Sequence, residues 1–115
     1  SDTPAESSAS IRERVVRARE VQTRRYQEYA DVHCNAQMNS RLIRRYAQPD
    51  AEGLEQLREA MARLNMSARA YDRILRVART IADLEGSEQV RMPHIREAVG
   101  YRNLDRANWA GSGTY

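Results

Sequence analysis

The chain of 115 residues carries 19 arginines, no lysine and 16 acidic residues, which gives a formal net charge of only +3. Its mean hydropathy of −0.81 and its lack of a long apolar run are typical of a soluble domain and argue against a membrane span. The single cysteine excludes an intrachain disulfide framework and fits a reducing compartment, so we expect one domain in the cytoplasm.

Small polar residues fill positions 1–9, and we expect them to form a flexible lead-in or the edge of an excised fragment. Ser10 and Glu13 then fit a capping box. Apolar residues follow at helical spacing, which predicts a helix over residues 10–30 with one inward line, namely Ile11, Val15, Ala18, Tyr26 and Tyr29.

The segment 31–38 shows no periodicity and is predicted to be a loop. Asn39 or Ser40 can cap a short helix that ends at Tyr46. Pro49 breaks that helix, and Asp50 caps a third one. The residues expected to face inward are Leu42, Ile43 and Tyr46 in the short helix and Leu54, Leu57, Met61 and Leu64 in the third.

Ser67 is predicted to open the most regular helix, and Gly86 to close it. After an extended connector at 89–92, Pro93 suits the first turn of a last helix. The inward faces of these two helices contain Tyr71, Ile74, Leu75, Ala78, Ile81 and Ala82, and then Ile95, Ala98, Val99 and Tyr101. From Asn103 onward we expect a flexible tail, in which Leu104 and Trp109 could dock.

These elements predict an all-α fold, a small bundle of four main helices plus a short one over residues 10–102, with a tail over 103–115. No segment longer than four residues alternates with period two, so we expect no sheet.

Catalytic and metal-binding motifs are not evident. His33, Cys34 and His94 offer too few spaced ligands for a metal site, and Cys34 is expected to be a small core thiol rather than a nucleophile. Neither a phosphate-binding loop with its lysine nor a G-x-G-x-x-G motif is present. The sequence therefore predicts no catalytic residue and no bound metal in this chain.

Arginines follow one side of the helix that begins after Ser67. Residues 67–79 contain four arginines and one acid, Asp72, and Arg69, Arg73 and Arg76 share a stripe with Thr80. A solvated polar face would explain this stripe. The alternative is an anion site, because Arg69 lies in the first turn, where free N–H groups and the helix dipole favour a phosphate.

The first predicted helix has polar residues beside its apolar line. Gln22 interrupts that line near its centre, and Arg14 and Arg25 lie on one flank. The two arginines could extend past the apolar surface into water or pair with an acid such as Glu97. The other possibility is that this edge faces a second domain or subunit, where Arg14 and Arg25 would contribute anion or subunit contacts.

Four stretches together resemble the C-terminal domain of the magnesium-chelatase-like bacterial AAA+ ATPases of the YifB/ComM type. The resemblance runs from about residue 7 to residue 106, and its most specific part is SARAYDRILRVARTIADL at 67–84. The other stretches are IRERVVRAREVQTRR at 11–25, NAQM at 35–38 and HIREAVGYR at 94–102.

The resemblance implies a helical lid that follows an upstream ATPase core with the Walker motifs. Ser67 and Arg69 are similar to the sensor-2 motif, so Arg69 would contact the γ-phosphate of ATP. Arg73 and Arg76 inherit no role, and we expect them to give charge support or a subunit contact. The parent protein would use ATP and Mg²⁺, assemble as a homo-hexameric ring and act on DNA as a branch-migration motor, with no membrane association.

We favour this interpretation, a non-catalytic lid that senses ATP and couples its hydrolysis to motion of the ring. One alternative is an independent DNA-binding module that uses Arg69, Arg73, Arg76 and Arg79 on phosphates. Another is an interaction adaptor whose apolar edge docks a partner helix.

Overall fold

The computed structural model describes residues 5–108 of the chain, and side chains through Tyr101. Within that range it contains five α-helices, namely α1 (Ser8–Arg25), α2 (Ser40–Tyr46), α3 (Ala51–Leu64), α4 (Ala68–Glu85) and α5 (Met92–Asn108). A single 3-10 turn, η1 (Asn35–Gln37), precedes α2. The all-α prediction is confirmed, because β pairing in the described range is limited to one isolated bridge between Pro49 and Val90.

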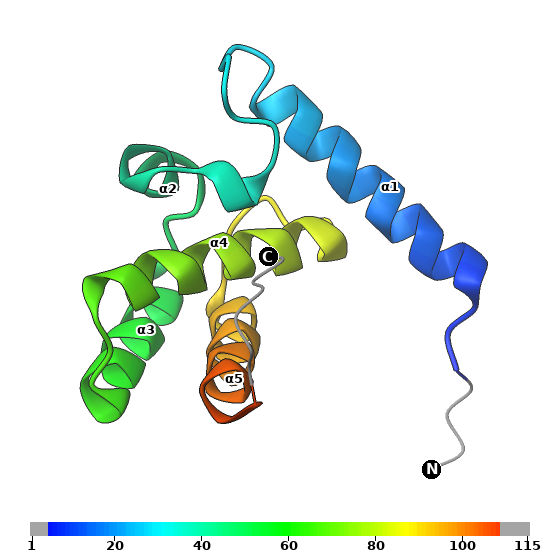
Figure 1. Ribbon diagram of the computed structural model, residues 1–115. Coiled ribbons are helices and arrows are strands. Elements are labelled where there is room, and N and C mark those ends of the chain that lie inside the picture. Colours follow the sequence, from blue (N-terminus) through cyan, green and yellow to red (C-terminus); the bar gives the residue numbers. More distant parts are fainter. Residues whose placement is uncertain (1–4, 109–115) are drawn as a thin grey trace.

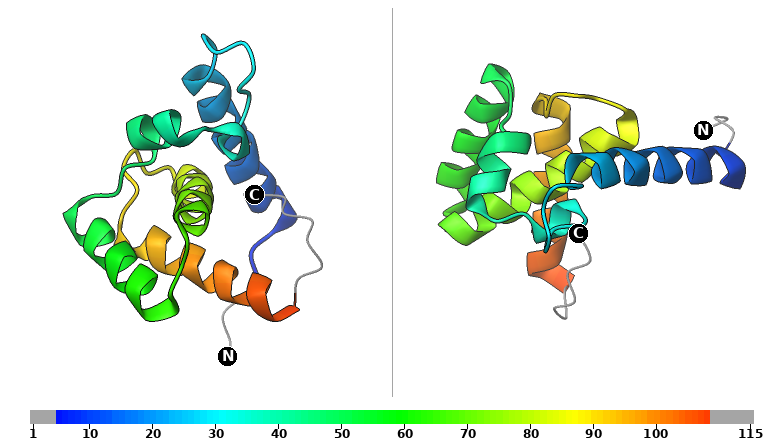
Figure 2. Two further views of the ribbon diagram at one scale, coloured as in Figure 1. Left: turned by 60° about the vertical axis from the view of Figure 1, so that its left-hand side comes forward. Right: turned by 90° about the horizontal axis from the view of Figure 1, so that it is seen from above.

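Helix α4 crosses the middle of the molecule and contacts α1, α2, η1 and α5 (Figure 1). Helix α3 packs on α5 below it. In the right-hand view of Figure 2, the first turns of α1 extend away from the other helices. Buried apolar residues of α2–α5 and of the α4–α5 connector form one cluster, which includes Ile43, Leu57, Ile74, Leu75, Ala78, Ala82, Val90, Ile95 and Ala98.

The helix starts predicted from capping residues are largely confirmed. The side chains of Asn39, Asp50 and Ser67 accept hydrogen bonds from backbone N–H groups three residues ahead, at 2.9, 2.8 and 3.2 Å. Gly86 ends α4 with φ of 82°, in the left-handed region where glycine is favoured. These features depend on neighbours within one turn, which is why the sequence alone could locate them.

The bounds of the first helix were predicted wrongly. Ser7 caps α1, since its Oγ accepts a hydrogen bond from the Ser10 N–H, whereas the Ser10 hydroxyl donates to Glu6. The helix ends at Arg25 instead of residue 30. The turn that follows brings Tyr26 and Tyr29 against Tyr46, with the three rings edge-to-face at 5.9–6.3 Å between centroids. Tertiary packing of these rings therefore ends α1 early.

Three further expectations differ from the structure. Cys34 is exposed and is not a core thiol. Ile11, placed on the inward line of α1, is 43% exposed, because this part of the helix lies beyond the bundle. Tyr101 is 38% exposed.

Helix α5 continues to Asn108, past the end predicted at residue 102. Of the expected tail, residues 109–115 with Trp109 lie outside the described residues, and the side chain of Leu104 is not described either. None of the described helices is long and apolar enough to span a lipid bilayer.

Candidate functional site

The exposed residue of the predicted anion stripe is Arg69, the second residue of α4. Ser67 caps the helix, and its Oγ accepts a hydrogen bond from Ala70 N at 3.2 Å. Arg69 is exposed at this end of the helix. An exposed guanidinium beside the positive end of a helix dipole is suited to an anionic ligand from outside the domain.

Farther along α4, the polar side chains hold the segment 35–40 in place. The Asp72 carboxylate accepts a hydrogen bond from the Ser40 hydroxyl at 2.7 Å, and Arg76 Nε donates to the Met38 carbonyl at 2.9 Å. One turn on, Thr80 Oγ1 accepts from Asn35 Nδ2 at 3.1 Å. The predicted stripe is therefore divided, since Arg76 and Thr80 tie α4 to the preceding segment. Arg73 lies between them and Arg69 and is half-buried.

Arg79 is buried, with 3% of its surface exposed. Its Nε donates to Asp83 Oδ1 at 3.1 Å, and its other nitrogens donate to the carbonyls of Tyr46, Ser87 and Glu88 at 2.7–3.1 Å. Burial lowers the pKa of Arg79 from its ordinary value, and the Asp83 carboxylate opposes that effect. The expectation that Arg79 could bind phosphates is wrong, because its donors hold α2 and the α4–α5 loop together.

Arg25 forms the second half of this buried network. Its Nη1 and Nη2 donate to the two carboxylate oxygens of Asp83, both at 2.8 Å, and Nη1 also donates to Asn35 Oδ1 at 3.0 Å. Burial alone would lower the pKa of Arg25, but its hydrogen bonds and charge interaction with Asp83 raise it above its ordinary value. Arg25 therefore joins α1 to α4 within the domain.

Asn35 completes the network at the start of η1. Its N–H donates to Gln22 Oε1 at 2.9 Å, and its Nδ2 donates to Asp83 Oδ2 at 2.8 Å. Its Oδ1 accepts from the Tyr26 hydroxyl at 2.7 Å, and burial raises the pKa of Tyr26 to about 12. Gln22 thus interrupts the apolar line of α1 because it binds the backbone of this loop. Every buried side-chain nitrogen and oxygen of the described residues has a hydrogen-bond partner.

Arg14 pairs with Glu6 in the lead-in to α1, not with Glu97. Both Arg14 and Glu97 nevertheless border a hollow of about 320 Å³ between α1, α4 and α5. Sequence reasoning missed Asn35 and Asp83 as buried polar residues. One sequence feature could have indicated that Asp83 is paired: Arg79 and Asp83 are four residues apart on one predicted helix, a spacing that allows an ion pair.

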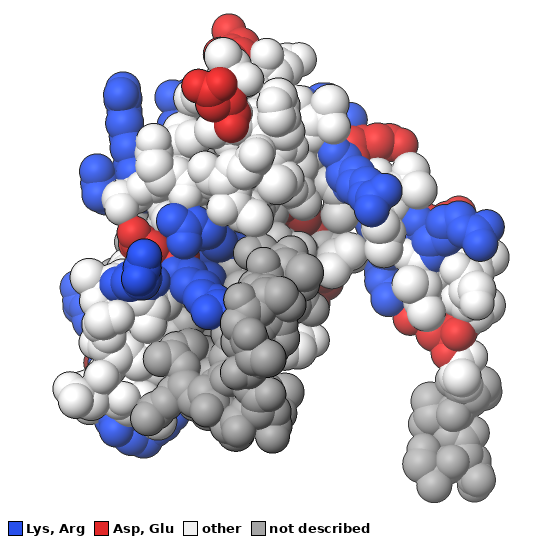
Figure 3. Space-filling view, viewed as in Figure 1, with Lys and Arg blue, Asp and Glu red and all other residues white. Residues whose placement is uncertain are grey.

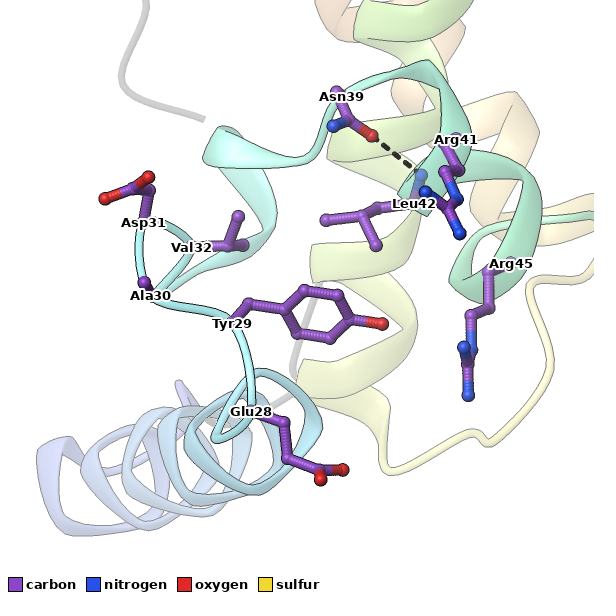
Figure 4. Close-up of a pocket in the computed structure, with 9 residues that line it drawn as sticks. All are labelled: Glu28, Tyr29, Ala30, Asp31, Val32, Asn39, Arg41, Leu42 and Arg45. Atoms are coloured by element: carbon purple, nitrogen blue, oxygen red, sulfur yellow. Dashed lines mark hydrogen bonds between the residues drawn. The ribbon is translucent and has the colours of Figure 1, made fainter.

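Exposed arginines also gather outside α4. Figure 3 shows positive side chains over α2 and the adjacent part of α4, and Arg41, Arg44 and Arg45 of α2 are all exposed. A pocket of about 500 Å³ lies between α2 and the loop after α1, with Tyr29, Val32 and Leu42 along it (Figure 4). Its edges carry both signs of charge, because Arg41 and Arg45 are accompanied by Glu28 and Asp31. This mixture does not favour an anion site there.

The two histidines have no metal-binding arrangement around them. Among the described residues, no three His, Cys, Asp or Glu side chains are grouped closely enough to hold a metal ion. His94 is buried at the start of α5, where its Nδ1 accepts a hydrogen bond from Arg91 N at 2.9 Å and its Nε2 lies 3.0 Å from Glu85 Oε1. His94 is the third residue of α5, and its side chain accepts from the backbone N–H of Arg91 just before the helix. This is the contact that the third helical residue makes in a capping box.

Comparison with known proteins gives a consistent family. The family model described as "Magnesium chelatase, subunit ChlI C-terminal" matches residues 5–102. The chain is 43% identical over 101 residues to "Competence protein ComM" of Haemophilus influenzae, and 40% identical over 103 residues to YifB of Escherichia coli. A Mycobacterium tuberculosis protein, Rv2897c, is 34% identical over 97 residues. These matches cover 84–90% of this chain but only 19% of each relative, so the chain spans about a fifth of their length.

Proposed function

The chain belongs to the family of magnesium chelatase ChlI C-terminal domains found in ComM and YifB proteins, and on that premise we propose that it is the lid of an AAA+ ATPase. In this proposal the lid has no catalytic residue, and the upstream core of the same polypeptide supplies the pocket for ATP and Mg²⁺. The observation that carries the proposal is the exposure of Arg69 at the first turn of α4, directly after the Ser67 cap.

Arg69 is the residue that contacts the γ-phosphate. Its guanidinium can donate two parallel hydrogen bonds to terminal phosphate oxygens, and the N-terminus of α4 adds favourable potential for the same anion. Arg73, about one helical turn farther on, adds positive charge. In this proposal Arg76, Arg25 and Arg14 do not contact the phosphate. They help to hold the domain together through the hydrogen bond or ion pair that each one forms within it.

Hydrolysis removes the phosphate that Arg69 holds, and this releases the lid from the core. The contacts of Asp72, Arg76, Thr80 and Asp83 tie α4 to the segment 25–40 along nearly its whole length. A displacement at Arg69 therefore moves α4, η1 and the end of α1 together. The lid transmits the state of the nucleotide as one rigid body.

For the complete protein, the proposal is a homo-hexameric ring that acts on DNA as a branch-migration motor. Its support is the relationship to the protein named "Competence protein ComM", together with the resemblance of the sequence to the magnesium-chelatase-like AAA+ ATPases. The proposal places the motor in the cytoplasm.

The test is Arg69→Ala in the full-length protein, with Arg58→Ala as the matched control, because Arg58 is an exposed arginine on α3. A charge-assisted hydrogen bond is worth about 1.5–3 kcal/mol, so we expect the steady-state ATPase rate to fall about ten- to a hundredfold. Arg69→Lys keeps the charge but lacks the planar guanidinium, so its ATPase rate should lie between those of the wild type and Arg69→Ala. Wild-type turnover in Arg69→Ala would refute the role of Arg69.

A further inference from the structure

The apolar line of α1 is longer than the bundle that covers it. Ile11 and Ala18 lie on the same side of the helix, because seven residues turn it by about two full turns. Ala18 is 3% exposed, whereas Ile11 is 43% exposed and Val15 is half-buried. The contacts that hold α1 to α4 and η1 come from its last turns, through Gln22 and Arg25.

A hollow lined by both apolar and charged residues lies beside the first half of α1. It is bordered by Arg14, Ile81, Leu84, Glu85, Glu97 and Tyr101, which come from α1, α4 and α5, and it encloses about 320 Å³. Ile81 and Leu84 are half-buried. Ile11 and Arg14 are neighbours on the helix surface, three residues apart, so the uncovered line and the hollow form one continuous surface. The right-hand view of Figure 2 shows that the first turns of α1 extend past the other helices.

Single exposed apolar residues need no explanation. Here the exposure rises along one helical line, from the buried Ala18 through the half-buried Val15 to the exposed Ile11, and ends beside a hollow, which indicates a missing neighbour. The family to which the chain belongs is defined as the C-terminal part of a larger subunit, and the relatives are about five times as long as the matched region. In such a protein most of the polypeptide precedes this domain and enters it through α1.

We propose that the first half of α1, with Ile11 and Val15, and the adjoining hollow form the docking surface for the preceding part of the longer protein. In this proposal, an apolar helix or strand of the preceding part packs against Ile11 and Val15 and fills the hollow between α1, α4 and α5. The charged rim of Arg14, Glu85 and Glu97 limits which element fits. This proposal uses the position of the domain in its family and not the role of Arg69, so its failure and the failure of the ATP-sensing role are distinguishable.

The test compares amide hydrogen exchange of residues 8–18 in the 115-residue chain and in the full-length protein. We expect exchange to be at least about tenfold slower in the full-length protein, because packing suppresses opening of the helix. Ile11→Asn should remove that protection. Val16→Asn is the matched control, because Val16 is equally exposed at 45% but lies about 140° around the helix from Ile11.

Equal exchange rates in the two proteins would overturn the proposal, and so would protection that survives in Ile11→Asn. A third result would also overturn it. If the 115-residue chain dimerises and its protection increases with concentration, a second copy of the chain occupies the surface. Thermal unfolding of the 115-residue variants checks that both substitutions leave the fold intact.

Discussion

Asp83 is the residue on which the buried polar network converges, so its removal should be the most damaging single substitution of a charged residue. Its carboxylate accepts two hydrogen bonds from Arg25, one from Arg79 and one from Asn35, all between 2.8 and 3.1 Å, and 4% of the residue is exposed. In Asp83→Ala, the buried Arg79 guanidinium keeps its charge but loses the Asp83 carboxylate with which it pairs.

Removal of one partner of a buried ion pair costs about 3–5 kcal/mol, because the other charge remains without compensation. A domain of this size is stable by about 5–15 kcal/mol, so Asp83→Ala should lose a large share of the total. The assay is urea denaturation followed by circular dichroism, with the free energy of unfolding extrapolated to water. Asp72→Ala is the control, because Asp72 lies on the same helix and accepts one hydrogen bond, from the exposed Ser40.

We expect the control to lose less than about 1 kcal/mol, as for an ordinary hydrogen bond near the surface. A loss of that same small size in Asp83→Ala would refute the reasoning, because it would mean that the network does not hold α1 against α4. The Arg25→Ala and Asp83→Ala double-mutant cycle then measures the coupling of this pair directly, and a coupling below about 0.5 kcal/mol would contradict the geometry.

Two further predictions concern the turn residues. Because burial raises the pKa of Tyr26 from 10.0 to about 12, the folded state favours the neutral phenol, so the contribution of Tyr26 to stability should be constant below pH 10 and fall as the pH rises toward 12. Tyr26→Phe should flatten this part of the stability–pH curve, and an unchanged slope would show that Tyr26 is not responsible. Gly86→Ala should lower the free energy of unfolding by about 1–2 kcal/mol, because φ is 82°. Apart from the chain neighbours, no atom of the described residues lies within 4 Å of the added Cβ, so the cost is conformational. Gly100→Ala, equally open but inside α5, should raise it by up to about 1 kcal/mol, and equal signs for the two glycines would contradict this account.

The candidate site could be anticipated only at its exposed end. Ser67 and Arg69 are recognisable because a cap and a first-turn arginine are local features, and the structure places both where the sequence predicts them. The division of the arginine stripe could not be predicted. In the sequence, Arg76 and Arg79 look like Arg69, because all three are arginines on the same predicted helix. Their roles depend instead on the carbonyls of Met38 and Tyr46, which are distant in sequence.

The sequence by itself determined the helical class, the caps of α2, α3 and α4, the end of α4 at Gly86 and the membership of the family. The helical class and the helix ends depend on periodicity or on residues within one helical turn, whereas the family is recognised from the resemblance of whole stretches such as 67–84. Only the tertiary structure decided where α1 ends, which arginines are buried and that Ile11, at the start of the apolar line of α1, lies exposed. The physical reason is that burial and charge pairing are properties of residues brought together by the fold, such as Arg25 and Asp83, which are 58 positions apart in the chain.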